Sequence, residues 1–144
     1  MKSVLVLNGP NLQRLGTREP EIYGNLDYQN LVDVLEKASA EMGLTVSVRQ
    51  SDSESELISW LHEATDAGMD VIFNPAAFTH YSYALSDACK IHTTSGAKLI
   101  EVHISNPSAR EEFRRTSVIS SAATGVIAGF GFESYLLALR HLSS

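Results

Sequence analysis

Val4-Leu5-Val6-Leu7 is a run of apolar residues, and the polar stretch Asn8-Gly9-Pro10-Asn11 follows it directly. Similar runs recur later in the chain at Val71-Ile72-Phe73, Leu99-Ile100-Glu101-Val102 and Gly125-Val126-Ile127-Ala128. Continuous runs of this kind are typical of strands buried on both faces, as in a parallel sheet. The stretch from Leu44 to Val48 alternates instead, which predicts a strand with one more solvated face at a sheet edge.

Helical patterns separate these runs. Three of the patterns show apolar residues at spacings of three and four, and a capping residue, a glycine or both mark a boundary of every pattern but the last. The stripes and boundaries are Leu31, Leu35, Ala38 and Met42 before Gly43; Leu57, Leu61 and Ala64 between Ser53-Glu56 and Gly68; residues 80–94 after Thr79; Ser108-Glu111 to about Arg115; and Glu133 to His141 with Leu136 and Leu139 inward.

The alternation of strands and helices predicts an α/β fold with a parallel sheet covered by helices on both faces. With five strands and right-handed crossovers, we expect a flavodoxin-like three-layer sandwich with strand order 2-1-3-4-5. The 144 residues suit one catalytic domain spanning residues 1–144.

Composition excludes several classes of protein. The single cysteine, Cys89, rules out a disulfide framework and a cysteine-based zinc site. A net charge of -6 argues against a nucleic-acid or anionic membrane surface. No apolar run approaches the roughly 18 residues of a membrane span, and no secretory signal opens the chain, so we expect a cytoplasmic protein.

Polar side chains collect where the predicted strands end, which is the edge where open α/β sheets bind ligands. Asn8 to Asn11 follow the first strand, Asn74 follows the third and His103 ends the fourth. Glu101 lies two residues before His103, so both side chains face the same side of the strand and the carboxylate could fix the tautomer of the imidazole. A buried structural Glu–His pair is the alternative interpretation.

Two more candidate groups are suggested by spacing. Arg18 and Tyr23 share a loop, and a nearby arginine favours the ionised form of a tyrosine, which could then act as a base. His80 and Asp87 are seven residues apart on one predicted helix, so both could face one pocket. Cys89 is more simply a buried, inert thiol than a nucleophile.

The motifs as a set resemble the type II 3-dehydroquinate dehydratases, and the resemblance covers essentially the whole chain. The matching stretches run in order through Asn8-Gly9-Pro10-Asn11-Leu12, Leu15-Gly16, Arg18-Glu19-Pro20, Tyr23-Gly24, Asn74-Pro75, Thr79-His80, Ala84-Leu85, Asp87-Ala88, Glu101 to Asn106, Ala109 to Arg114, Ala123 to Ile127, Gly129-Phe130-Gly131 and Tyr135 to Leu139.

This resemblance implies a lyase that reversibly dehydrates 3-dehydroquinate to 3-dehydroshikimate, the third step of the shikimate pathway. It implies an anti elimination through an enolate, without metal, organic cofactor or Schiff base. It also implies a homododecamer built as four trimers, with no nucleic-acid or membrane partner.

The resemblance also implies residue roles. Tyr23 would be the base, with Arg18 favouring its ionised form; His103 would be the general acid, oriented by Glu101; and Asn11 would help stabilise the enolate. The expected substrate contacts are Asn74, His80, Arg114 and the backbone N–H groups of Ile104 and Ser105, with Asp87 approaching from a neighbouring subunit.

Some positions depart from the common family pattern: most flank the His80 segment, one lies in the loop after the first strand, and one follows Asn106. They are Gln13, Ala76, Phe78, Tyr81, Tyr83, Ser86 and Pro107. A non-catalytic flavodoxin-like ligand-binding relative is the alternative function. A phospho-receiver would need an aspartate where Asn74 stands, and a flavin module would need a Ser/Thr-rich loop where Asn8-Gly9-Pro10-Asn11 stands.

Overall fold

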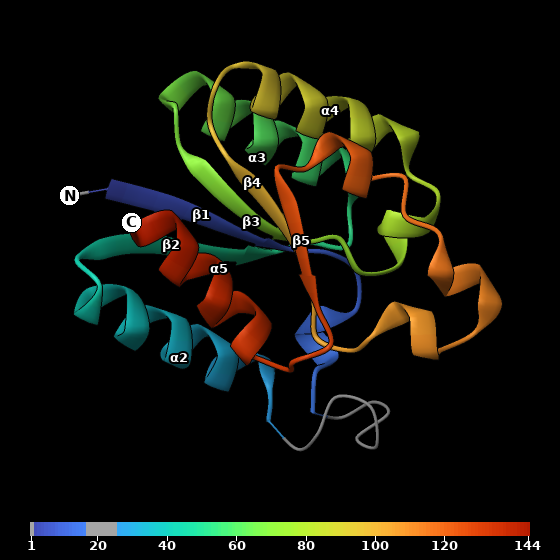
Figure 1. The fold of residues 1–144 in the computed structure, drawn as a ribbon, viewed down its shortest axis with the longest axis horizontal. Coiled ribbons are helices and arrows are strands. Elements are labelled where there is room, and N and C mark those ends of the chain that lie inside the picture. Colours follow the sequence, from blue (N-terminus) through green and yellow to red (C-terminus); the bar gives the residue numbers. More distant parts are fainter. Residues whose placement is uncertain (1, 17–25) are drawn as a thin grey trace.

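A computed structural model describes residues 2–16 and 26–144. At its centre is a five-stranded parallel sheet with strand order β2-β1-β3-β4-β5 (Figure 1). The strands are β1 (Lys2–Asn8), β2 (Leu44–Gln50), β3 (Asp70–Asn74), β4 (Leu99–His103) and β5 (Gly125–Ala128). The predicted α/β class and strand order are confirmed.

Two helices cover each face of the sheet (Figure 1). On one face lie α2 (Tyr28–Glu41) and α5 (Glu133–Ser143), and on the other lie α3 (Glu54–Ala67) and α4 (Tyr83–Thr94). The predicted stripes face the sheet: Leu31 and Leu35 are fully buried on one side, and Leu57 and Leu61 on the other. This arrangement is the expected three-layer sandwich.

Exposure along the strands follows their place in the sheet. All residues of β3 and β4 are buried, whereas β2 at one edge is only partly buried, as its alternating sequence predicts. The run from Gly125 to Ala128 was expected to be buried on both faces, and this expectation is wrong because β5 forms the other edge. Ile127 packs on the core beneath α5, but Val126 is 49% exposed.

Most helix boundaries follow from local chemistry. Gly68 directly follows α3 and Gly43 follows Met42, the C-cap of α2; both glycines adopt positive φ, the left-handed conformation that glycine accepts at a helix end. The Ser53 hydroxyl accepts from the Glu56 N–H, as predicted, but the Glu56 carboxylate accepts from Ser51 at 2.5 Å instead of closing the box.

The predicted helix over residues 80–94 begins later than expected. A 3-10 helix, η2 (Ala76–His80), comes first, and α4 starts at Tyr83 with Ser82 as its N-cap. The Ser82 hydroxyl accepts from the Leu85 N–H at 3.1 Å. Thr79, the predicted N-cap, does not cap α4, because its buried hydroxyl donates to Glu101 instead.

The predicted capping box at Ser108 and Glu111 is also wrong. Two 3-10 turns, η3 (Pro107–Ala109) and η4 (Glu112–Arg115), replace the short helix. The Asn106 side chain accepts from the Ser108 N–H at 3.1 Å, so Asn106 caps the first turn, and Pro107 suits its first position because proline lacks the N–H. Two further turns are η1 (Leu12–Arg14) and η5 (Ser120–Ala122).

The register brings the polar strand ends together. Asn8 at the end of β1 pairs with Asn74 at the end of β3, and His103 ends the next strand along the sheet. Residues 9–11, which follow β1, therefore lie at the same end of the sheet as Asn74 and His103. Among the described helices, none has the length and apolar character to cross a membrane.

Candidate active site

A pocket of about 110 Å³ lies at the carboxyl ends of β1, β3 and β4. Seven of the residues predicted for the site line it, namely Asn11, Asn74, His80, His103, Ile104, Ser105 and Arg114. The other described lining residues are Pro10, Leu12, Ala76, Ala77, Pro107 and Arg110. The pocket is therefore where the strand-end rule predicts a ligand site.

The remaining predicted residues lie elsewhere. Glu101 lies behind His103 and is 1% exposed, so it does not line the pocket. Asp87 is exposed on α4 and does not line this chain's pocket. The expectation that His80 and Asp87 share one helix is wrong, because His80 belongs to η2 and α4 begins after it. Arg18 and Tyr23 lie outside the described residues.

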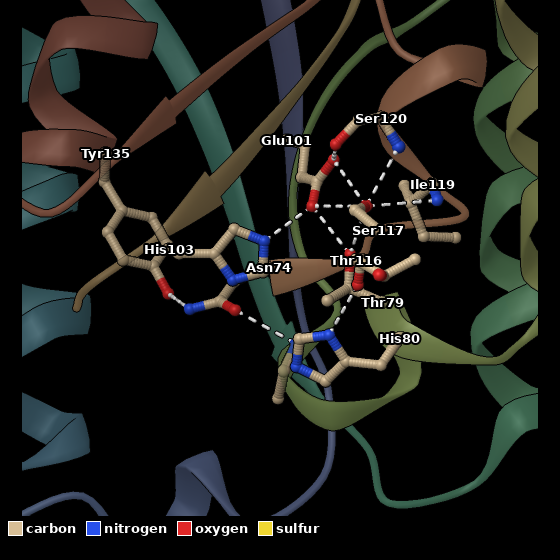
Figure 2. A network of polar contacts seen from close by, with 11 residues as sticks. Asn74, Thr79, His80, Glu101, His103, Thr116, Ser117, Ile119, Ser120 and Tyr135 are labelled. Carbon is tan, nitrogen blue, oxygen red and sulfur yellow. Dashed lines mark hydrogen bonds and ion pairs between the residues drawn. The ribbon is translucent and has the colours of Figure 1, made fainter. Parts of the chain in front are cut away.

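His103 and Glu101 form a tight pair, as the spacing of two along β4 predicts. His103 Nε2 lies 2.5 Å from Glu101 Oε2, and the imidazole is almost entirely buried (Figure 2). An ionised carboxylate accepts only, so Nε2 carries the hydrogen in this contact. His103 Nδ1 is then the ring nitrogen left for the pocket side.

Glu101 is surrounded by hydrogen-bond donors. Ser120 Oγ donates to Oε1 at 2.6 Å, and Thr79 Oγ1 donates to Oε2 at 2.7 Å (Figure 2). Burial alone would raise the pKa of this carboxyl. The hydrogen bond and charge of His103 lower it, and so do the hydrogen bonds from the two hydroxyls. Together they outweigh burial and hold the pKa below its usual value. Glu101 is therefore a buried carboxylate.

His80 is held by a backbone carbonyl. Its Nδ1 lies 2.7 Å from the Thr116 oxygen, and a carbonyl can only accept, so Nδ1 carries a hydrogen (Figure 2). The ring also packs edge-on against Phe113, with centroids 6.0 Å apart. Nε2 of the neutral imidazole is thus the nitrogen able to accept a hydrogen bond from a ligand hydroxyl.

Asn74 is oriented by a buried network that sequence reasoning missed. Its Nδ2 donates to the Tyr135 hydroxyl at 2.8 Å, and that hydroxyl donates to Asn8 Oδ1 at 2.6 Å. Asn74 Oδ1 accepts from the Ala76 N–H at 3.1 Å. Complete burial raises the pKa of Tyr135 and keeps the phenol neutral, so its hydroxyl both accepts from Asn74 and donates to Asn8. A tyrosine within an apolar helix stripe gave no signal of this role.

Asn11 stands in the left-handed region with a φ of 70°, which asparagine tolerates better than most residues. Its N–H donates to Asp52 Oδ1 at 2.9 Å, and Gln50 Nε2 donates to the same oxygen at 3.0 Å. The end of β2 thus fixes the backbone that carries Asn11 into the pocket.

Two arginines give the pocket positive charge. Arg114 Nε donates to Glu111 at 2.5 Å, and its guanidinium lies 4.9 Å from the centroid of Phe113. Arg110 also lines the pocket, and its Nη1 donates to Ser105 Oγ at 3.4 Å. Arg110 was not among the predicted site residues. Its place in the arginine-rich stretch after β4 was the sequence signal that could have indicated it. A protein of net charge -6 thus holds a locally cationic site.

Two other expectations concern reactive groups. Burial, with a smaller contribution from the charge of Glu101, raises the pKa of the Cys89 thiol to about 12, so this cysteine is an inert core residue. Within residues 2–16 and 26–144, histidine, cysteine and carboxylate side chains form no group of three or more that could hold a metal ion.

Comparison with known proteins agrees with this geometry. The family model described as dehydroquinase class II matches residues 2–143. The chain belongs to the class II dehydroquinase family. It is 55% identical to 3-dehydroquinate dehydratase of Salinispora tropica over 141 residues, covering 98% of this chain and 96% of that one. It is 56% identical to the enzyme of that name from Mycobacterium tuberculosis, covering 97% and 93%.

Solved structures of the family have the same fold. The crystal structure of type II dehydroquinase from Propionibacterium acnes superposes with a TM-score of 0.96 at 50% identity, covering 99% of this chain and 97% of that one. The type II dehydroquinase of Butyrivibrio crossotus gives a TM-score of 0.95 at 43% identity, covering 99% and 98%. The family resemblance seen in the sequence motifs is thereby confirmed.

Proposed function

We propose that this chain is a 3-dehydroquinate dehydratase that eliminates water from 3-dehydroquinate to give 3-dehydroshikimate, the third step of the shikimate pathway. The observation that carries this proposal is the His103–Glu101 pair, which opens onto a cationic pocket in a chain of the class II dehydroquinase family. The names of the relatives support the same reaction.

The pair suits the difficult half of the elimination. Hydroxide is a poor leaving group, so the C1 hydroxyl needs a proton as its bond to carbon breaks. His103 would donate that proton, and the buried carboxylate of Glu101 stabilises the imidazolium that must be present beforehand. The departing hydroxyl leaves as water.

The other half removes a proton from C2, next to the ketone. Tyr23 would be the base and Arg18 would favour its ionised form, an assignment supported by their motif matches alone because both lie outside the described residues. The enolate then carries negative charge, and Asn11 at the pocket would help to stabilise it. Proton removal by Tyr23 and proton donation by His103 balance the reaction without a cofactor or Schiff base.

The remaining lining residues would bind the anionic, hydroxylated substrate. Asn74, held by Tyr135, would face the carboxylate and the C1 hydroxyl, and the backbone of Ile104 and Ser105 would hold the carboxylate. His80 and Arg114 would contact the ring hydroxyls. Each role matches the chemistry of a group that lines the pocket.

We further propose that the single catalytic unit of residues 1–144 assembles as a cytoplasmic homododecamer of four trimers. Tyr83, Asp87 and Ile91 recur every four residues on one exposed face of α4, and Tyr83 and Ile91 are 74% and 51% exposed. An apolar helix face of this kind supports burial against a neighbouring subunit. Asp87 on that face would then enter the neighbour's site.

The direct test is to mix the purified protein with 3-dehydroquinate and follow the ultraviolet absorbance of the conjugated enone product, with and without borohydride. We expect an increase in absorbance that survives borohydride. Tyr23→Phe should abolish most turnover while substrate binding persists, and near-normal turnover in that variant would remove Tyr23 as the base. Bound substrate without any absorbance change in the wild type would instead indicate a non-catalytic relative.

A further inference from the structure

One short segment contacts one pocket histidine directly and reaches the other through Glu101. Residues 116–120, here the 116–120 segment, run from the end of η4 into η5. The Thr116 carbonyl accepts from His80, and Ser120 donates to Glu101, which in turn accepts from His103 (Figure 2). Neither serine of this segment lines the pocket, so any effect on the reaction acts through the histidines.

The hydroxyl protons around Glu101 can be assigned by counting donors. Ser117 Oγ accepts from the Ile119 and Ser120 N–H groups at 3.2 and 3.1 Å. It lies 2.8 Å from Thr79 Oγ1 but 3.2 Å from the nearer Glu101 oxygen. Since each hydroxyl has one hydrogen, the short contacts are satisfied when Ser117 donates to Thr79 and Thr79 donates to Glu101.

This order forms a chain of hydrogen bonds that all point toward the carboxylate. It starts at backbone N–H groups of η5, passes through Ser117 and Thr79, and ends at Glu101 Oε2. Ser120 completes the set on Oε1. Successive hydrogen bonds polarise one another in a buried site, so this arrangement favours a carboxylate over a carboxylic acid.

We propose that Ser120, Ser117 and Thr79 are positioning residues for the reaction, which hold Glu101 as a carboxylate and thereby set the tautomer and acid strength of His103. The expected changes in kcat and KM rest on the proposed function. The same segment fixes His80 through Thr116, so its folding orders both histidines of the pocket together.

The proposal predicts the sign of a pH effect. Without the Ser120 hydroxyl, the negative charge on Glu101 is less dispersed and attracts the His103 proton more strongly. His103 then becomes a weaker acid that retains its proton to higher pH. The other described titratable groups around the pair are Cys89 on α4, which interacts with the charge of Glu101, and His80, Arg110 and Arg114 lining the pocket. None of these is changed by the substitution.

The test compares Ser120→Ala with Ser121→Ala across about pH 6 to about pH 10. Ser121 is an exposed neighbour in η5 with no contact to Glu101, which makes it a matched control. We expect Ser120→Ala to lower kcat about ten-fold with a much smaller change in KM, and to move the alkaline limb of the kcat profile to higher pH. Ser120→Thr should restore most of the rate because it keeps the hydroxyl.

A double-mutant cycle with Glu101→Gln tests whether Ser120 acts through Glu101. We expect Ser120→Ala to cost less than about two-fold in the Glu101→Gln background, because the carboxylate on which it acts is gone. Thr79→Val gives a second, independent variant and should act in the same direction. A loss of kcat without movement of the pH limb, an equal loss in Ser121→Ala, or additive effects in the cycle would overturn the proposal.

A measurement without turnover separates this proposal from the proposed function. Nitrogen-15 NMR of the histidine side chains should show His103 protonated at Nε2 in the wild type and a higher titration midpoint in Ser120→Ala. If the wild type turns over no 3-dehydroquinate, the proposed function fails while the NMR result still decides the positioning role. An unchanged His103 titration would overturn that role in either case.

Discussion

At the scale of single residues, Ala76 is the position where the pocket wall conflicts with backbone preference. Its φ is +53°, a left-handed conformation that costs a residue with a Cβ roughly 1–2 kcal/mol. Ala76 is one of the positions that depart from the common family pattern, and this departure has a conformational cost. The Ala76 N–H donates to Asn74, which holds the residue in this conformation despite the cost.

Ala76→Gly should therefore raise the free energy of unfolding by about 1 kcal/mol, since the relief of backbone strain exceeds the added freedom of the unfolded chain. Urea denaturation measures the change. Ala77→Gly is the matched control in the same turn, where glycine should lower stability by about 0.5–1 kcal/mol. Equal effects at the two positions would contradict the explanation.

The buried carboxylate of Glu101 links stability to pH. Its pKa in the folded protein lies below the ordinary value of 4.5, because the surrounding donors outweigh burial. A depressed carboxyl pKa contributes stability that is complete above the unfolded pKa and is lost as the pH falls through the folded pKa. This contribution is thus present at neutral pH and disappears in acid below about pH 4.5.

Glu101→Gln should lower the free energy of unfolding by about 2 kcal/mol at pH 7 and by clearly less in acid. Unfolding curves of both proteins at neutral pH and near pH 4 provide the comparison. The pKa of Asp70 is also lowered, because its contacts with Lys2 and the Lys98 N–H outweigh partial burial. Asp70 is present in both proteins, so its contribution to the pH dependence cancels in the comparison. A pH-independent difference would mean that Glu101 is not ionised in the fold.

Sequence reasoning reached the residues whose neighbours are local in the chain. The spacing of two on β4 was enough to pair Glu101 with His103. The partners of that pair come from Thr79 and Ser120, which lie 22 and 19 residues from Glu101. Such contacts depend on how distant turns pack, and hydroxyl residues in turns carry no sequence signal for them.

At the scale of elements, the approach of two strand ends shapes the pocket. Gly9 follows β1, and its N–H donates to the backbone carbonyl oxygen of Asn74 at 2.8 Å. A Cβ added at Gly9 would lie 2.4 Å from the Pro75 carbonyl oxygen, a backbone atom that cannot move aside without displacing the end of β3. Glycine is therefore required here by space.

Gly9→Ala should reduce the free energy of unfolding by about 3 kcal/mol and strongly impair substrate binding, because Asn74 would shift with Pro75. Thermal unfolding and substrate titration measure the two effects. Gly43→Ala isolates backbone strain, since its Cβ would meet open space while its φ stays at 75°. That variant should lose only about 1 kcal/mol and bind substrate normally.

Strands were more predictable than turns at this scale. The apolar runs located the strands, although the last of them is an exposed edge strand, and the strand order followed from the crossover rules. The start of α4 was misplaced because Thr79 and Ser82 are both acceptable caps, and only tertiary packing shows that the Thr79 hydroxyl is already used. The short helix predicted up to about Arg115 was wrong for a similar reason, because Asn106 and Pro107 favour a tight turn over a longer helix.

At the scale of the whole molecule, the exposed face of α4 raises the question of where Asp87 acts. The side chain does not line the pocket of its own chain, yet it lies on the apolar face that carries Tyr83 and Ile91. If a trimer buries this face, each site takes Tyr23 from one subunit and Asp87 from its neighbour. Activity would then belong to the pair of subunits, and two inactive variants could complement each other.

Mixing Tyr23→Phe with Asp87→Ala subunits should thus regenerate activity that neither variant has alone. A working site needs an Asp87→Ala subunit, which keeps Tyr23, beside a Tyr23→Phe subunit, which keeps Asp87. Random mixing in equal amounts gives this arrangement at about one site in four, so about a quarter of wild-type activity should return after dissociation and reassembly. Mixing without prior dissociation is the control and should restore none. If reassembled mixtures stay inactive while gel filtration shows intact oligomers, Asp87 does not serve a neighbouring site.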